Sequence, residues 1–192
     1  MSLGYVETLA SISGDGTALT AAARASLLQG AGGKQGLYTL PANKLRVNDI
    51  LVLDAAGRIS CVVTTPGTAR FDLSAGVAGA ALFDSLAINL NINAKTNVPW
   101  LLHAEGTVRI IGNVAQLFWQ GWFQSEALIG SLVANVGSTG ITTIPINTAP
   151  VLGTAFDHSI AQILDFNFTQ TVATGSVQLH NYKLALHTST GF

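Results

Sequence analysis

Histidines and acidic residues, the side chains best suited to bind a metal ion, occur in this sequence only in small groups. His103 and Glu105 are two residues apart, so on an extended strand both side chains project from the same face. His180 and His187 are seven apart, so on a regular strand they project from opposite faces. A structural zinc site needs four ligands and a catalytic site needs three. We therefore predict no metal site and interpret His103 and Glu105 as a surface pair.

The residue types of a hydrolytic triad are also present, at Asp157, His158 and Ser159. They are consecutive, and neighbours on an extended chain point apart, so they cannot act together as a triad. The sequence contains no Gly-x-Ser-x-Gly motif and no phosphate-binding loop. The single cysteine, Cys61, is in phase with the apolar residues of its strand and is predicted to be a core residue. We expect no catalytic residue, no cofactor and no enzymatic activity.

The segment Gln116–Glu126 (QLFWQGWFQSE) is unusual because it has bulky side chains on both faces of a predicted strand. The two faces are Leu117, Trp119 and Phe123, and Phe118, Gln120, Trp122 and Gln124. One set can enter the core of the domain, and the other then needs a different partner. We favour a subunit interface for the second set, because few charges flank it. The alternative is that Phe118 and Trp122 form a platform for a sugar.

Period-two alternation predicts the strands that position these side chains. The predicted strands are Asn48–Leu53, Arg58–Thr65, Arg70–Ser74, Leu86–Asn93, Trp100–Ile111, Gln116–Glu126, Ser159–Gln170 and Ser176–Thr188. Asp54–Gly57 is predicted to be the turn between the first two. About eight to ten strands without alternating helices exclude a doubly wound α/β fold. They predict an all-β antiparallel sandwich, for which a jelly roll fits best and an immunoglobulin-like sandwich is the alternative.

The N-terminal region differs from the rest of the chain. Residues 1–36 are predicted to be an arm that carries one short helix over Ala18–Leu28, with Thr20 as its N-cap and a glycine-rich stop after it. Residues 37–192 are predicted to form the jelly-roll domain. The start of the chain has no pattern of a signal peptide, and no apolar run is long enough for a transmembrane helix.

The composition favours association with other proteins. Nine Lys and Arg residues against ten Asp and Glu give a net charge of −1, so a nucleic-acid or anionic-membrane surface is not expected. Only 10% of the residues are charged, against about 25% in ordinary soluble domains. A surface of low charge promotes association. This suits a protein that is largely covered by copies of itself or by partners.

Several short stretches, in this order, resemble a group of virion structural proteins of tailed bacteriophages. They are GDGTALT (14–20), SLL (26–28), YTLPAN (38–43), AGRIS (56–60), VVTTPGT (62–68), NAKTNVPW (93–100) and VQLH (177–180). The resemblance covers about residues 7 to 188. It implies a non-enzymatic particle component with a jelly-roll-like sandwich, commonly a homotrimer, which is either a decoration or cement protein of the head or a component of the tail or fibre.

The resemblance and the composition together predict a homotrimeric decoration protein on the outer capsid surface, with itself and the major capsid protein as partners and with no nucleic acid or membrane bound. Phe118, Gln120, Trp122 and Gln124 are the predicted subunit-interface residues, and Arg24, Leu27 and Leu28 are predicted to contact the capsid. The alternative function is a tail or fibre module that binds host surface carbohydrate. That alternative requires an exposed aromatic groove.

Overall fold

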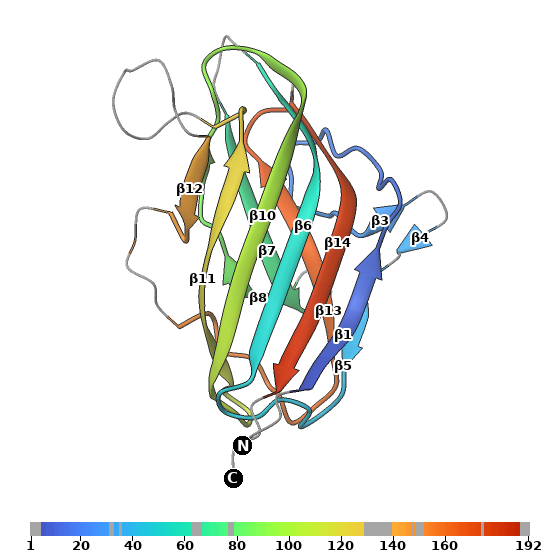
Figure 1. Ribbon diagram of the computed structural model, residues 1–192, viewed down its shortest axis with the longest axis vertical. Coiled ribbons are helices and arrows are strands. Elements are labelled where there is room, and N and C mark those ends of the chain that lie inside the picture. The colour runs from blue at the N-terminus through green and yellow to red at the C-terminus, as the bar shows by residue number, and fades with distance from the viewer. Residues whose placement is uncertain are drawn as a thin grey trace.

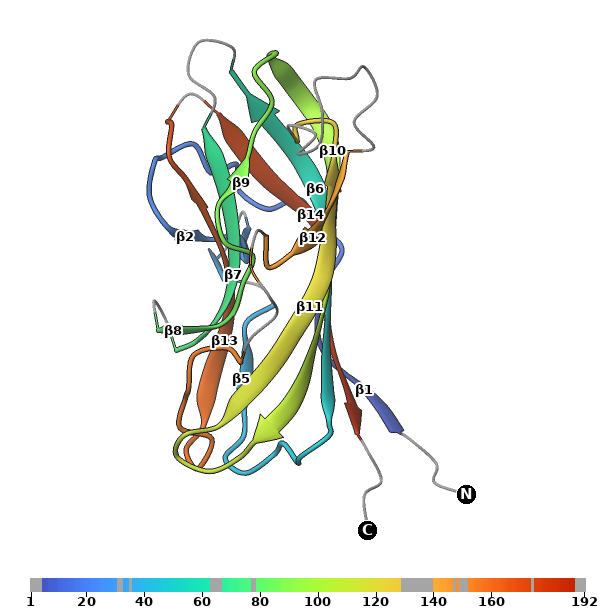
Figure 2. The ribbon, with the colours of Figure 1, turned by 90° about the vertical axis from the view of Figure 1, so that its left-hand side faces the viewer.

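The protein is a sandwich of two antiparallel β-sheets in a computed structural model (Figures 1 and 2). The structure describes residues 5–30, 33–34, 36–62, 67–76, 79–128, 140–146, 148, 152–173 and 175–188. Every strand pair in these ranges is antiparallel. The all-β antiparallel sandwich predicted from the sequence is therefore confirmed. Its jelly-roll connectivity stays a prediction.

The front sheet, which faces the viewer in Figure 1, has six strands in the order β1-β14-β6-β10-β11-β12. Their bounds are β1 Tyr5–Ile12, β14 Ser176–Thr188, β6 Ile50–Cys61, β10 Lys95–Ile110, β11 Gln116–Ser125 and β12 Ile141–Ile144.

The back sheet has the order β2-β13-β7-β8, with β5 also paired to β13 and β9 to β7. Its strands are β2 Ala25–Ser26, β13 Gln162–Gln170, β7 Thr68–Ala75, β8 Ala80–Asp84, β5 Tyr38–Leu40 and β9 Ile88–Asn89. A separate small ladder joins β3 Gln29–Gly30 to β4 Gly33–Lys34. Figure 2 shows the two sheets packed face to face, with the start of β1 and the end of β14 side by side at one end of the front sheet.

Aromatic side chains from both sheets form the centre of the core. The ring of Phe71, on β7, lies 5.1 Å from each of three rings, those of Trp100, Phe123 and Phe168. Trp100 and Phe123 come from the front sheet, so Phe71 connects the two layers. Inward positions of β10 and β11 are thereby fixed in the core, and the alternate positions of both strands must face outward.

No helix forms over Ala18–Leu28, so this prediction was wrong. The segment is extended with bends, and its backbone bonds go to two neighbouring strands: Leu19 pairs with Val177 on β14, and the Leu27 amide donates to the Phe166 carbonyl on β13 at 2.8 Å. Leu27 and Leu28 are 1% exposed. Burial of two leucines and pairing with two sheets outweigh the weak helix propensity of the alanine-rich run. The part of the chain that the structure describes contains no helix that could span a lipid bilayer.

The predicted turn at Asp54–Gly57 is also absent, because β6 runs through it without interruption. Gly57 has a different role. A Cβ at this position would lie 1.9 Å from the Gln178 carbonyl oxygen of β14, next to an irregularity in the pairing between Leu179 and Asn181. The glycine therefore permits β14 to approach β6 closely, and Asp54 becomes a residue of the outer face of the sheet.

Candidate functional site

One row of side chains crosses the outer face of the front sheet. The residues lie opposite one another in the strand register, and are Ser11, Lys183, Asp54, His103, Trp122 and Thr143, on β1, β14, β6, β10, β11 and β12. All six are exposed or half-buried. Because the alternate residues of these strands face the core, the six side chains point to the outer face of the sheet. Strand register therefore brings together polar and aromatic groups from distant parts of the chain.

His103 lies between two carboxylates at the centre of this row. Its Nδ1 is 2.6 Å from Oδ1 of Asp54, and its Nε2 is 3.4 Å from Oε1 of Glu105. An ionised carboxylate only accepts hydrogen bonds, so Nδ1 carries the proton donated to Asp54. The surface pair His103 and Glu105 predicted from the sequence is thus present, with Asp54 as a third member.

Trp122 lies beside His103 on the neighbouring strand. The two rings are stacked, with centroids 5.9 Å apart and planes 27° apart. Trp122 is 37% exposed, whereas Trp100 and Trp119 are at most 2% exposed. The stacked imidazole fixes the position of the indole, and the remaining indole surface is available to a ligand.

These side chains line an open groove of about 550 Å³ on the outer face. Its lining residues are His103, Glu105, Gln120, Gly121, Trp122, Thr143, Ile144, Pro145 and Thr148. Gly121 permits β10 and β11 to lie close together here, because a Cβ at that position would be 2.0 Å from the His103 carbonyl oxygen. The groove combines an aromatic surface with carboxylate, amide, imidazole and hydroxyl groups, which is the composition of a polar small-molecule site.

The four predicted interface residues share this outer face. Gln120 and Trp122 are exposed and Phe118 and Gln124 are half-buried, whereas the alternate residues Leu117, Trp119 and Phe123 are buried. The guanidinium of Arg109 lies over the Phe118 ring, 5.6 Å from its centroid. The predicted division of β11 into two faces is correct. A subunit interface on the outer face stays a prediction.

The three predicted capsid-contact residues lie elsewhere, on the back sheet. Leu27 and Leu28 are core residues, so their side chains do not reach the surface on which a capsid protein could dock. Arg24 donates from Nε to Asp72 Oδ1 at 3.0 Å and from Nη2 to Oδ2 at 2.5 Å. This hydrogen bonding raises the pKa of Arg24. The side chains expected to reach a partner are thus engaged within the chain itself.

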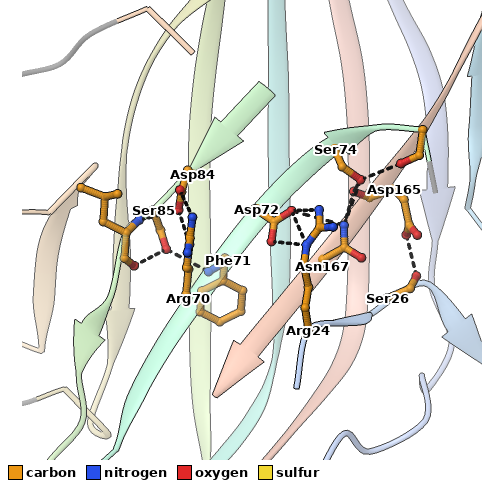
Figure 3. Close-up of polar contacts among 12 residues, drawn as sticks. Arg24, Ser26, Arg70, Phe71, Asp72, Ser74, Asp84, Ser85, Asp165 and Asn167 are labelled. Carbon is orange, nitrogen blue, oxygen red and sulfur yellow. Dashed lines mark hydrogen bonds and ion pairs between the residues drawn. The ribbon is translucent and has the colours of Figure 1, made fainter. Parts of the chain in front are cut away.

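Arg24 belongs to a polar network on the back sheet (Figure 3). Asn167 Nδ2 donates to Asp72 Oδ2 at 3.3 Å and to Ser74 Oγ at 3.1 Å. Ser26 Oγ donates to Asp165 Oδ1 at 2.5 Å. Asp72, Ser74, Asp165, Asn167 and Ser26 are all buried. Beside this network, Arg70 pairs with Asp84. Hydrogen bonds of this network therefore connect the N-terminal segment to the back sheet.

The candidate catalytic groups do not assemble into a reactive centre. Ser159 donates from both its amide and its hydroxyl to Asp157 Oδ1, which lowers the pKa of Asp157 and closes a local turn. His158 is 2% exposed, and its Nε2 accepts a hydrogen bond from the Leu45 amide. Within the described residues, no group of three His, Cys, Asp or Glu side chains could hold a metal ion. Both ring nitrogens of His103 face carboxylates, so neither activates a nucleophile.

Asp54 and Thr143, which lie beside His103 and Trp122 in the strand register, are not predicted as site residues from the sequence. Asp54 falls in the predicted turn, although the apolar or small residues at alternate positions from Leu51 to Cys61 indicate one continuous strand. Thr143 lies on the short edge strand β12, and no pattern in the sequence pairs that strand with β11.

Comparisons with known proteins add little to this geometry. No protein-family model and no curated protein matches the chain. Among solved structures, the chain is similar to the CBM2 module of the evolved Dit of Lactobacillus casei BL23 phage J-1, with 10% sequence identity, a TM-score of 0.37, and coverage of 98% of this chain and 99% of that one. A likeness this distant does not establish a shared function.

Proposed function

We propose that the outer face of the front sheet is a carbohydrate-binding surface centred on Trp122, and that the chain is a glycan-recognition module of a phage virion, in its tail or fibre. The observation that carries the carbohydrate proposal is the groove that joins exposed Trp122 to His103, Glu105 and Gln120. The virion part rests on the resemblance of the ordered sequence segments. The proposal includes no catalytic step.

The chemistry of the groove matches that of a pyranose ring. The C–H face of a sugar is apolar and stacks on an aromatic side chain, while its hydroxyls need hydrogen-bond donors and acceptors around the rim. Trp122 supplies the stacking surface, held by the His103 ring at 5.9 Å. Glu105 and Gln120 lie opposite each other in the register of β10 and β11. A carboxylate and an amide are therefore both close to the indole.

The test is a glycan array followed by calorimetry on the sugars that bind. Trp122→Ala is expected to weaken binding at least tenfold, because the stacking surface is lost. Phe118→Ala is the matched control: Phe118 is an aromatic residue on the same strand and face, but it does not line the groove. Unchanged binding by Trp122→Ala, or no binding to any glycan, would overturn the proposal.

A second candidate uses the same face as the interface of a homotrimeric capsid decoration protein. It is favoured by apolar side chains on three adjacent strands, since Leu101, Trp122 and Ile141 are all at least 37% exposed. In this case Phe118→Ala and Trp122→Ala both weaken assembly. Native mass spectrometry at micromolar concentration separates the candidates: a trimer that both variants dissociate supports the interface, and a monomer excludes it.

A further inference from the structure

We propose that the groove selects a sugar that carries a protonated amine, with the ammonium group seated between Nε2 of His103 and Glu105, against the Trp122 ring. This inference rests on the proposed carbohydrate binding and names the chemical class of its ligand. The sugar is an amino sugar whose nitrogen is not acetylated.

Nε2 of His103 and Oε1 of Glu105 face each other at 3.4 Å, longer than the usual hydrogen-bond distance between such groups. In the neutral tautomer that donates from Nδ1 to Asp54, Nε2 presents a lone pair, so Nε2 and Glu105 can both accept from one donor placed against them. An ammonium group has three N–H donors. It can satisfy both groups and keep one donor for Gln120, which lies opposite Glu105.

The charge of the groove lining also favours a cation. Among the described residues that line the groove, Glu105 supplies a carboxylate, and none is a lysine or an arginine. Asp54, which is hydrogen-bonded to His103, adds a second carboxylate. Lys183 lies opposite Asp54 in the strand register. With His103 neutral, the two carboxylates and Lys183 together carry one net negative charge. This cluster therefore attracts a cation and repels a uronic acid or a phosphorylated sugar.

Trp122 provides an aromatic surface for the same cation. An ammonium ion is attracted to the face of an aromatic ring within about 6 Å, and tryptophan gives the strongest attraction. His103 covers part of the indole, and the remaining exposed surface borders the groove. A neutral N-acetyl group gains neither this attraction nor a charge-assisted hydrogen bond to Glu105.

The experiment compares three soluble oligosaccharides of equal length by calorimetry: a glucosamine oligomer, an N-acetylglucosamine oligomer and a galacturonic acid oligomer. The glucosamine oligomer is expected to bind about tenfold more tightly than the acetylated one, the equivalent of one strong charged contact. The uronic acid oligomer is expected to bind most weakly. The preference is expected to decrease at high salt because the contact is electrostatic.

Two variants assign the preference to the groove. Glu105→Gln is expected to bring the ratio of the two affinities close to one. Glu126→Gln removes the same charge from an exposed residue outside the groove, and is expected to keep the wild-type ratio. Circular dichroism melting of both variants checks that they are folded.

The outcomes separate this inference from the proposed function. Equal affinity for the acetylated and free-amine oligomers, lost in Trp122→Ala, overturns the amine preference and supports carbohydrate binding. Tighter binding of the uronic acid oligomer also overturns the preference. Absence of binding to all three oligomers counts against the amine preference, and the glycan array then decides whether the proposed function fails as well.

Discussion

At the scale of single residues, the neighbours of a side chain decide what it can do. His103 and His158 are both histidines beside acidic residues, but one faces a groove and the other is inside the protein. Nε2 of His158 accepts a hydrogen bond from the Leu45 amide at 2.9 Å, so this nitrogen carries no proton in the folded protein. His103 instead has carboxylates at both nitrogens, which makes it a polar contact for a ligand.

The titration of His158 gives a prediction of how the stability of the folded protein depends on pH. Burial lowers the pKa of His158, and nearby Asp157 opposes part of this effect. The unfolded chain therefore binds a proton more readily than the folded protein does. Stability is expected to fall as the pH drops below about 6.5, the value for an exposed histidine, and to keep falling until the lowered folded value is reached, by at most about 1.4 kcal/mol per pH unit.

Urea unfolding of the wild type and of His158→Gln between pH 7.5 and pH 5 checks this prediction. Glutamine can still accept the Leu45 hydrogen bond but does not titrate. The difference in unfolding free energy between the two proteins should therefore shrink as the pH falls. Parallel pH curves for the two proteins would show that His158 does not titrate on unfolding.

At the scale of elements, the outer-face residues follow from strand register, and the long strands could be predicted from the sequence. The bounds of β14 are the predicted ones, Ser176–Thr188. Along β10, buried and more exposed residues alternate from Trp100 to Val108, after which a register shift leaves Ile110 39% exposed. Leu86–Asn93 forms only the two-residue strand β9, because Leu86 has a positive φ of 60° and Ile92 is exposed.

The sequence could not predict the path of the N-terminal segment or the complete groove. Local propensity favours a helix at residues 18–28, and only contacts with β13 and β14 reverse it. Likewise, the polarity of Asp72, Asp165 and Asn167 indicates solvent exposure, whereas the folded chain buries them with Arg24. Such contacts, for example the pairing of Leu19 with Val177, join distant parts of the chain, and no local pattern contains them.

The Arg24 network gives a stability prediction at this scale. Arg24→Ala leaves the Asp72 carboxylate, whose side chain is 4% exposed, without its charged partner. We expect a loss of about 2 kcal/mol in unfolding free energy, a value reduced for the partly exposed arginine. The matched control is Arg70→Ala, whose ion pair with Asp84 has side chains 47% and 24% exposed, and which should cost less than about 1 kcal/mol. Equal losses in the two variants, measured by urea unfolding, would contradict the role given to burial.

At the scale of the whole molecule, the sandwich separates two tasks. The back sheet and the N-terminal segment stabilise the fold through buried polar groups such as Asp72, Asp165 and Asn167, whereas the front sheet keeps polar and aromatic groups on its outer face. The low content of charged residues makes the carboxylates beside Trp122 a distinctive local feature. Both proposed functions use this one face, so the accessibility of Trp122 distinguishes them.

Quenching of tryptophan fluorescence by acrylamide measures that accessibility directly. Trp100 and Trp119 are buried, so the quenched emission comes from Trp122. The account predicts strong quenching in the free protein that does not change with protein concentration, and protection when a saturating glycan identified by the array is added. Trp122→Phe should abolish the quenchable fraction. Quenching that stays unchanged when the glycan saturates the protein would contradict carbohydrate binding at this face.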